Sequence, residues 1–238
     1  MALPEIVSQE EWLAARKKLL VQEKEVTRRI DAVNADRRRL PMVRVTKPYR
    51  FVGADGEVGL ADMFTSRQLI VQHVMFHPEW ENACDSCTSS VDELPEGTIR
   101  HLADRETTFV LVSRAPYEKL AAYRDRKGWT LPWYSSLGSD FNYDFDVTMD
   151  PAVKAPVYNY RPLPWEVESP IGDEQPGISC FLRDGDDIFH TYSTFARGSD
   201  QLGGGYTFLD LTALGRQEEW EEPKGRVEFA NASRPDFS

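Results

Sequence analysis

Two stretches decide the fold of this chain: the apolar run LIVQHVMF at residues 69–76 and the tetrapeptide CDSC at residues 84–87. A short run rich in Leu, Ile and Val is typical of a buried strand. A loop that leaves such a strand and delivers two cysteines to a helix start places them near backbone N–H groups and the helix dipole, which stabilise a thiolate. We therefore interpret Cys84 and Cys87 as a redox dithiol. Cys84 is the predicted nucleophile, and Cys87, one helical turn deeper, is predicted to resolve the mixed disulfide.

The residues of the motif also leave other interpretations open. Asp85 opposes the loss of a proton from its neighbour Cys84, so we expect a milder nucleophile than in a dithiol flanked by apolar or basic residues. Two buried, inert cysteines are one alternative, and half of a zinc site is another. The chain has no second C-x-x-C and no paired-histidine spacing to complete a zinc site. We therefore expect neither a metal nor a cofactor.

Downstream of the first strand, predicted helices alternate with a second buried strand. The predicted elements are helix at 86–94 and 98–104 with a break at Pro95, strand at 107–113, and helix at 117–127 ending at Gly128. Proline and glycine mark these boundaries because proline interrupts a helix and glycine commonly ends one. Fully apolar strands that alternate with helices predict a βαβ unit with parallel strands.

A predicted antiparallel hairpin, with strands at 178–183 and 188–194, follows later in the chain. Cys180 shares one strand face with apolar neighbours, so we expect it to be buried as a small hydrophobe. Pro176 directly precedes the hairpin. In dithiol folds of this topology a cis proline at that position faces the cysteines, which makes Pro176 a candidate for the substrate site. An ordinary turn proline is the alternative.

The second strand of this hairpin carries the hydrogen-bonding run HTYST at residues 190–194. Strict alternation along a strand predicts His190 and Tyr192 on one face and Ser193 on the other. These side chains either line a pocket or form cross-strand pairs on an exposed face. We include His190 and Tyr192 among the candidate substrate-binding residues.

The first forty residues predict one long helix over 9–40. Ser8 and Glu11 form a capping-box signature, and Pro41 stops the helix. Apolar residues recur every seven positions, but the complementary seam positions are charged, which gives half of a coiled-coil seam. The heptad residues are Trp12, Leu19, Val26, Val33 and Leu40. The helix either lies across its own subunit or packs on a second subunit in a homodimer.

Composition excludes several classes of partner. The formal net charge of −11 repels phosphate backbones, so we expect no nucleic-acid partner. The longest apolar run is too short to span a bilayer as a helix, and the N-terminus has no signal-peptide pattern, so we expect no membrane association. The 3 cysteines are not the even framework of a small secreted scaffold. These features favour a soluble protein in the reducing cytoplasm.

Several longer segments resemble a known family. They are Met75–Trp80, Cys84–Cys87, Val112–Pro116, Gly138–Phe145 and Phe189–Thr194. Together they are similar to an uncharacterised family of predicted thioredoxin-like dithiol-disulfide oxidoreductases or isomerases. The resemblance implies an α/β, thioredoxin-like fold and a dithiol redox activity. It also implies that Trp80, four positions before Cys84, belongs to the substrate site.

The segment between the cysteines departs from related folds. It is Asp-Ser where thioredoxins have Gly-Pro, which leaves the reduction potential and the partner open. A peroxiredoxin would have Thr or Ser at the position of Glu81 and Pro at the position of His77. A peroxidase activity at Cys84 is therefore disfavoured.

The predicted organisation has three parts: a helical arm at 1–41, a thioredoxin-like domain at 42–215 with an aromatic-rich insertion at about 129–175, and a polar C-terminal tail at 216–238. The predicted function is thiol-disulfide exchange with a protein or a small molecule. Two other functions stay open. One is a non-catalytic binding or assembly module on a thioredoxin scaffold, and the other is a small-molecule enzyme that uses the cluster at 189–197.

Overall fold

The computed structural model describes residues 3–163, 166–167, 173–202, 204, 211–212, 219 and 224. The chain divides into two compact units, residues 1–41 with 206–235 and residues 42–205 with 236–238. Apart from positions 219 and 224, the polar tail predicted at 216–238 lies outside the described residues. No helix in the described part of the chain has the length and hydrophobicity that a bilayer crossing needs.

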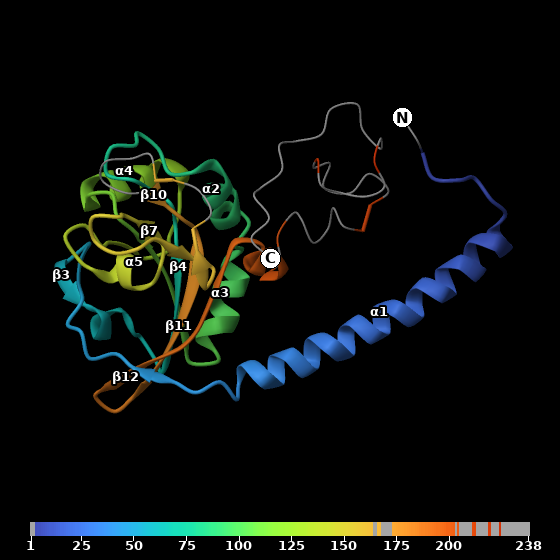
Figure 1. Cartoon of the computed structure of the whole chain (residues 1–238), viewed down its shortest axis with the longest axis horizontal. Helices are drawn as coiled ribbons and strands as arrows, with labels where there is room; N and C mark the ends of the chain where they lie inside the picture. The colour runs from blue at the N-terminus through green and yellow to red at the C-terminus, as the bar shows by residue number, and fades with distance from the viewer. Residues whose placement is uncertain are drawn as a thin grey trace. The chain divides into compact units, whose positions relative to one another are not determined.

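The first unit contains α1 (Gln9–Arg37), one continuous helix drawn in blue in Figure 1. It begins with the predicted capping box, because the Ser8 hydroxyl accepts from the Glu11 backbone N–H and the Glu11 carboxylate accepts from the Ser8 N–H. The helix ends three residues before the predicted position. Its last carbonyls accept tighter i→i+3 bonds from Arg39 and Leu40 instead. No residue of α1 is buried, and all five heptad residues are exposed.

The second unit is built around a sheet of eight described strands in the order β1-β12-β11-β4-β5-β6-β2-β3. These strands are β1 (Val43–Arg44), β2 (Arg50–Gly53), β3 (Gly56–Gly59), β4 (Gln68–His73), β5 (Thr107–Ser113), β6 (Trp133–Ser135), β11 (Gly177–Asp184) and β12 (Asp187–Phe195). β5 is parallel to β4 and to β6, whereas β11 is antiparallel to β4 and to β12. The short 3-10 helices are η1 (Leu60–Met63) and η2 (Ala196–Leu202).

Four of these strands define the fold class. The chain passes from β4 through α2 (Asp85–Asp92) and α3 (Glu96–Ala103) into the parallel strand β5, then through α4 (Tyr117–Lys127), and returns later as the β11–β12 hairpin. The resulting order β12-β11-β4-β5, with β11 antiparallel to its neighbours, is the thioredoxin-like arrangement of a βαβ unit followed by a hairpin. The predicted α/β, thioredoxin-like fold with a long N-terminal helix is confirmed.

The strongest local patterns correspond closely to the structure. Every residue of β5 after Thr107 is buried, as its continuous apolar run predicts. α4 ends at Gly128, which adopts the left-handed conformation with φ of 69°. β4 ends at His73 and not at Phe76, because its neighbour β11 begins opposite His73 at Gly177.

The aromatic-rich segment predicted as an insertion begins within the sheet itself. β6, only three residues long, pairs with β5, and so short a strand leaves no periodic signal in the sequence. The rest of the segment consists of α5 (Phe141–Asp144), β7 (Thr148–Met149), β8 (Val157–Tyr158), β9 (Arg161–Pro162) and β10 (Asp173–Glu174). β10 pairs with β7 and β8 pairs with β9, each as a separate two-stranded ladder.

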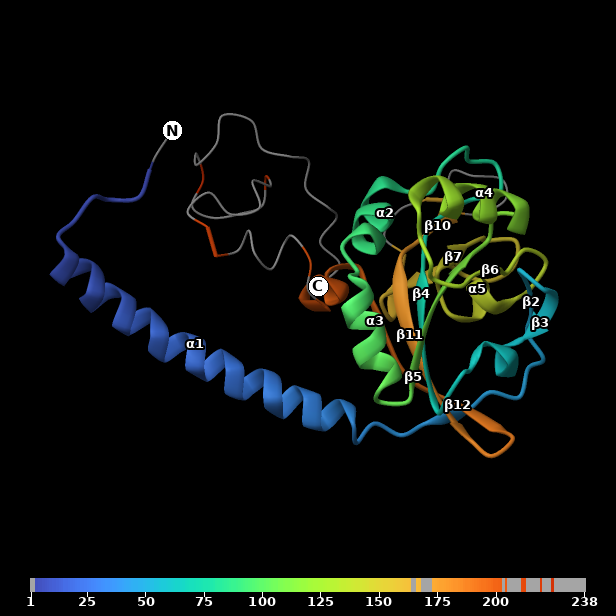
Figure 2. The ribbon, with the colours of Figure 1, turned by 180° about the vertical axis from the view of Figure 1, so that it is seen from behind.

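The sheet separates two hydrophobic clusters. In Figures 1 and 2, α2 and α3 lie on one side of β4 and β11, and α5 lies on the other. Cys87, Val91 and Leu120 pack in the cluster on the α2 side. The cluster on the α5 side contains Leu69 and Phe141. The dithiol and α5 are therefore supported by opposite faces of the same sheet.

Candidate dithiol site

The first cysteine stands at the start of α2. Cys84 is the residue that precedes the first turn, and Asp85 begins the helix. The backbone N–H of Cys84 donates to the Met75 carbonyl at 2.9 Å, and the Cys84 carbonyl accepts from Thr88 at 2.9 Å. These two bonds fix the start of α2 against the chain that leaves β4. Cys84, Cys87 and Cys180 form no disulfide bond in the structure.

The two sulfurs of the motif differ in access. Cys84 is partly exposed, whereas Cys87 is 5% exposed and packs in the cluster on the α2 side. Cys84 stands before the first helical turn, whereas Cys87 lies within that turn and its side chain faces the core. An accessible thiol therefore stands beside a buried one.

Hydrogen bonds lower the pKa of Cys84 to about 5. The largest contribution comes from the Cys87 side chain, and burial of Cys84 opposes it. The Ser86 hydroxyl, 3.2 Å from the sulfur, and the backbone N–H groups of Ser86 and Cys87 lower the pKa further. Asp85, which we expected to oppose thiolate formation, is not among these causes. At neutral pH Cys84 is a thiolate.

The loop before the dithiol is held by α4. Lys119 Nζ donates to the carbonyl of Pro78 at 2.7 Å and to that of Trp80 at 3.2 Å. The Trp80 backbone N–H donates to the His77 carbonyl, and the two rings lie 5.8 Å apart. Trp80 is 39% exposed, so its indole ring presents a flat apolar surface to solvent on this loop. Sequence reasoning missed Lys119, because a lysine within a helix carries no local sign of a contact with a distant loop.

Pro176 lies at the end of the sheet from which the dithiol loop leaves. It precedes Gly177, which pairs with His73, the last residue of β4. A Cβ on Gly177 would lie 2.8 Å from a ring carbon of Phe195, so only glycine fits there. The Pro176 carbonyl accepts from the Tyr158 hydroxyl at 2.7 Å. The backbone beside Pro176 is therefore closely held.

A buried ion pair follows β5, at the sheet end toward which β4 also runs. Arg114 Nε lies 2.9 Å from Glu174 Oε1, and both side chains are at most 5% exposed. Glu174 also accepts from Thr148 at 2.9 Å and from Asn142 at 3.4 Å. Burial raises the pKa of Glu174 to about 7, although Arg114 opposes the shift. The sequence offered one unused signal, an arginine directly after a fully apolar strand.

The remaining two predicted substrate residues lie on the second hairpin strand. The His190 ring packs on Phe145 and Phe181, with ring centroids 5.2 and 5.6 Å away, on the α5 side of the sheet. Tyr192 stands opposite Cys180 in the pairing of β11 with β12. The structure thus brings Cys84 and Cys87 together at the start of α2, with Trp80 on the loop before them and Pro176 at the same end of the sheet. His190 lies apart from them, against Phe145 and Phe181 on the α5 side.

The predicted alternation along this strand is wrong. Cys180 pairs with Tyr192 and the next residue, Phe181, pairs with His190, so Thr191 is an extra residue in β12. Such a bulge shifts the alternation by one residue. It brings His190 Nε2 to 2.8 Å from Ser193 Oγ, although the sequence pattern predicted these two side chains on opposite faces of the strand.

The fold and the dithiol at the start of α2 define a thioredoxin-like protein. The chain belongs to the family described as "Bacterial protein of unknown function (DUF899)", whose model matches residues 1–233. The resemblance to an uncharacterised thioredoxin-like family is thereby confirmed. No curated protein matches the chain. Among the described residues, no group of three or more His, Cys, Asp or Glu side chains is placed to hold a metal ion.

Solved structures similar to this chain include three peroxiredoxins. A cysteine-to-serine mutant of Xylella fastidiosa PrxQ is 11% identical, covering 68% of this chain and 91% of its own, with a TM-score of 0.44. Xanthomonas campestris peroxiredoxin Q is 11% identical, with coverage of 68% and 93% and a TM-score of 0.46. The peroxidoxin BcpB from Mycobacterium tuberculosis is 12% identical, with coverage of 68% and 92% and a TM-score of 0.44. These likenesses do not bear on the chemistry of Cys84.

Proposed function

We propose that this protein is a thiol-disulfide oxidoreductase that uses Cys84 and Cys87. One observation supports the proposal above all. A partly exposed Cys84 with a pKa of about 5 stands at a helix start, and a buried Cys87 stands one turn further along the same helix. An accessible thiolate beside a protected second thiol is the arrangement that reversible disulfide exchange requires.

The reaction proceeds in two exchange steps. The Cys84 thiolate attacks one sulfur of a substrate disulfide, an S–S bond forms between Cys84 and that sulfur, and the other substrate sulfur leaves as a thiolate. Cys87 then gives up its proton and attacks the Cys84 sulfur, which releases the second substrate thiol. The dithiol has lost two electrons to the substrate and has become an intramolecular disulfide. A separate thiol reductant restores it.

The proposed substrate is a protein or small-molecule disulfide that lies against Trp80 and Pro176. Trp80 supplies an exposed apolar surface, and Pro176 lies at the end of the sheet from which the dithiol loop leaves. We place this activity in the cytoplasm, where a reductant keeps thiols reduced. The exposed heptad residues of α1 support a homodimer as the proposed assembly.

Reduction of insulin by the full-length protein, with dithiothreitol as reductant, tests this function. We expect the wild type to accelerate insulin precipitation and Cys84→Ser to remove that acceleration. Cys87→Ser is expected to turn over far more slowly and to accumulate a mixed disulfide with the substrate, visible by mass spectrometry. Cys180→Ser is the matched control, because burial raises the pKa of Cys180 to about 11 and the proposed steps do not use it.

Two results contradict the proposal. One is a wild type that does not accelerate the reaction, and the other is a Cys84→Ser variant with full activity. An inactive wild type whose Cys84 and Cys87 alkylate no faster than free cysteine would favour the non-catalytic binding or assembly module instead.

A further inference from the structure

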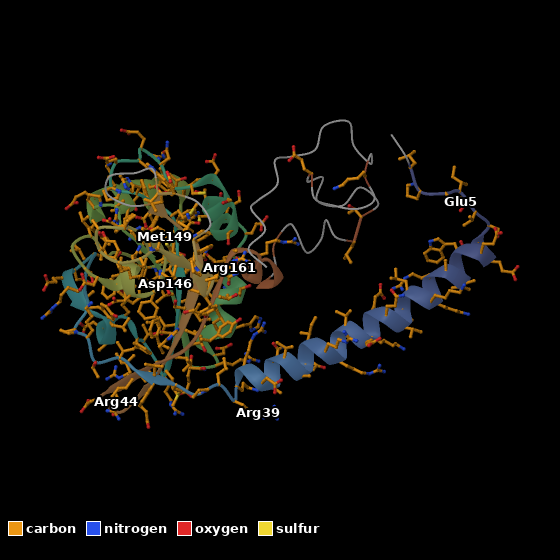
Figure 3. The ribbon with its side chains drawn as sticks, viewed as in Figure 1. Glu5, Arg39, Arg44, Asp146, Met149 and Arg161 are labelled. Atoms are coloured by element: carbon orange, nitrogen blue, oxygen red, sulfur yellow. The ribbon has the colours of Figure 1, made fainter. Side chains whose placement is uncertain are left out.

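A cavity of about 270 Å³ lies on the α5 side of the sheet, and a ligand bound in it would serve a function additional to the proposed redox chemistry. Its wall includes Tyr49, Phe145, Tyr160, His190, Ser193 and Phe195. Asp146, labelled in Figure 3, also contributes to the wall. Neither Cys84 nor Cys87 lines this cavity, so whatever binds there does so away from the dithiol.

A chain of hydrogen bonds runs from this cavity into the protein interior. His190 Nε2 lies 2.8 Å from Ser193 Oγ, and both residues line the cavity. Ser193 Oγ lies 2.9 Å from the hydroxyl of the fully buried Ser179. The Ser179 hydroxyl in turn lies 2.9 Å from Nε2 of His73, which is 2% exposed.

The inner end of the chain sets the direction of its hydrogen bonds. Burial first, and the nearby His190 second, lower the pKa of His73 to about 3, so the ring is neutral and carries one N–H. Its Nδ1 is buried without a hydrogen-bond partner. A buried N–H without a partner is rarer and more costly than a bare acceptor, so the proton belongs on Nε2. His73 therefore donates to Ser179.

This direction determines what the cavity offers to a ligand. Ser179 accepts from His73 and donates to Ser193. Burial lowers the pKa of His190, so its ring is neutral, and a hydrogen bond with the Tyr192 backbone, which raises that pKa, is one that the ring donates. The single N–H of His190 is thus used there, so its Nε2 accepts from Ser193. A serine oxygen accepts two hydrogen bonds and donates one. Ser193 Oγ thus has one acceptor position left, and its residue lines the cavity. A ligand that uses this position must donate a hydrogen bond.

The charged groups of the wall are already paired within the protein. Lys47 Nζ lies 2.7 Å from Asp144, and the Tyr49 hydroxyl donates to the same carboxylate at 2.8 Å. Asp146 pairs with Lys154. Among the residues that line the cavity, the cations Arg44 and Lys47 equal in number the carboxylates Asp144 and Asp146, so the lining presents no excess charge to attract an ion.

Aromatic rings supply the apolar part of the wall. The rings of Tyr160 and Phe195 meet edge to face with centroids 5.5 Å apart, and Phe145 meets His190 in the same way at 5.2 Å. Small-molecule sites typically combine such apolar walls with a few fixed polar atoms. A cavity of this volume accommodates roughly one substituted six-membered ring.

We propose that this cavity binds a small, uncharged aromatic molecule that carries a hydrogen-bond donor, such as a phenol, with the donor on Ser193 Oγ. The rings of the wall contact the ligand ring. The chain from His73 to His190 holds the Ser193 oxygen in place to accept.

Three probes of similar size test the proposal on the full-length protein by ligand-observed NMR and calorimetry. Phenol has the ring and the donor, anisole has the ring without the donor, and benzoate has a negative charge. We expect saturable binding of phenol, at least about tenfold weaker binding of anisole because the acceptor is left unpaired, and the weakest binding of benzoate. Equal affinities for phenol and anisole, or no binding of phenol, would overturn the proposal.

Two variants locate the site. Ser193→Ala is expected to reduce the affinity for phenol to that for anisole. Val43→Trp, at an exposed position of the wall outside the hydrogen-bond chain, is expected to reduce the affinity for both probes, and it replaces Ser193→Ala if that variant does not fold. Cys84→Ser is expected to bind phenol like the wild type. Unchanged affinity for phenol in Val43→Trp would place the binding elsewhere and reject this cavity.

Discussion

Cys84 and Cys180 are chemically the same group, both partly exposed, in two regions of one domain. At the start of α2, hydrogen bonds from the Cys87 thiol, from Ser86 and from backbone N–H groups lower the pKa of Cys84 to about 5. In the middle of β11, the backbone of Cys180 pairs with Ile70 and Tyr192, and burial raises its pKa to about 11. The difference indicates that donor groups at a helix start, and not exposure alone, decide which thiol loses its proton more readily.

The largest expected effect is a difference between the pH profiles of alkylation by iodoacetamide. Between pH 7 and pH 9 the rate at Cys180 is expected to rise about 100-fold, because below its pKa each pH unit increases the thiolate tenfold. The rate at Cys84 is expected to stay constant over this range, because its thiolate is already formed. Peptide mapping by mass spectrometry reports both sites in one sample.

The absolute alkylation rates at pH 7 test the same difference between Cys84 and Cys180. At pH 7 the thiolate fractions differ by about four orders of magnitude, but the more basic thiolate is about 300- to 1000-fold more nucleophilic. We therefore expect Cys84 to react about tenfold or more faster than Cys180. Parallel pH profiles for the two sites would contradict the assigned environments.

A smaller effect is expected when the hydrogen bonds at the helix start are removed one at a time. Cys87→Ala removes the largest contribution to the lowered pKa of Cys84, so this pKa is expected to rise. An upward shift of one unit would lower the thiolate fraction at pH 5 about fivefold and, because the more basic thiolate is about threefold more nucleophilic, would lower the alkylation rate about twofold. Ser86→Ala is expected to shift the pKa in the same direction by less. Cys180→Ala is the control, and equal rates in all four proteins would refute the assigned cause.

The same lowered pKa is expected to affect stability. An unfolded cysteine has a pKa of about 8.5, and the folded-state pKa of Cys84 lies below it, at about 5. The stabilisation from the thiolate is therefore complete above about pH 8.5 and is lost as the pH falls through about 5. In thermal unfolding under reducing conditions, the Tm of the wild type relative to Cys84→Ser is expected to be higher at pH 8.5 than at pH 5. A pH-independent difference would exclude this linkage.

The start of α2 and the His190 cluster on β12 also differ in how far the sequence predicts them. The capping box at Ser8 and Glu11, the strand at 107–113 and the helix at 117–127 follow local rules, and the structure has each of them. The position of Cys84 before the first turn of α2 belongs to the same group. In each case neighbouring residues alone determine the backbone, through a cap, a continuous apolar run or a glycine.

The His190 cluster depends on contacts that local rules do not contain. The extra residue Thr191 arises from the pairing of β12 with β11, and it brings His190 and Ser193 together against the predicted alternation. The sequence of β12 alone does not predict the bulge, because a bulge depends on the pairing of two strands.

The sequence by itself determined the dithiol, its place at a helix start and the alternation of strands and helices that carries it, because these features depend on residues a few positions apart. Only the tertiary structure decided the contact of Lys119 with the Trp80 loop, the buried pair of Arg114 and Glu174, and the chain from His73 to the cavity. Each of these depends on burial, on atomic distances or on groups brought together from distant segments, and burial and hydrogen bonding set their charge states.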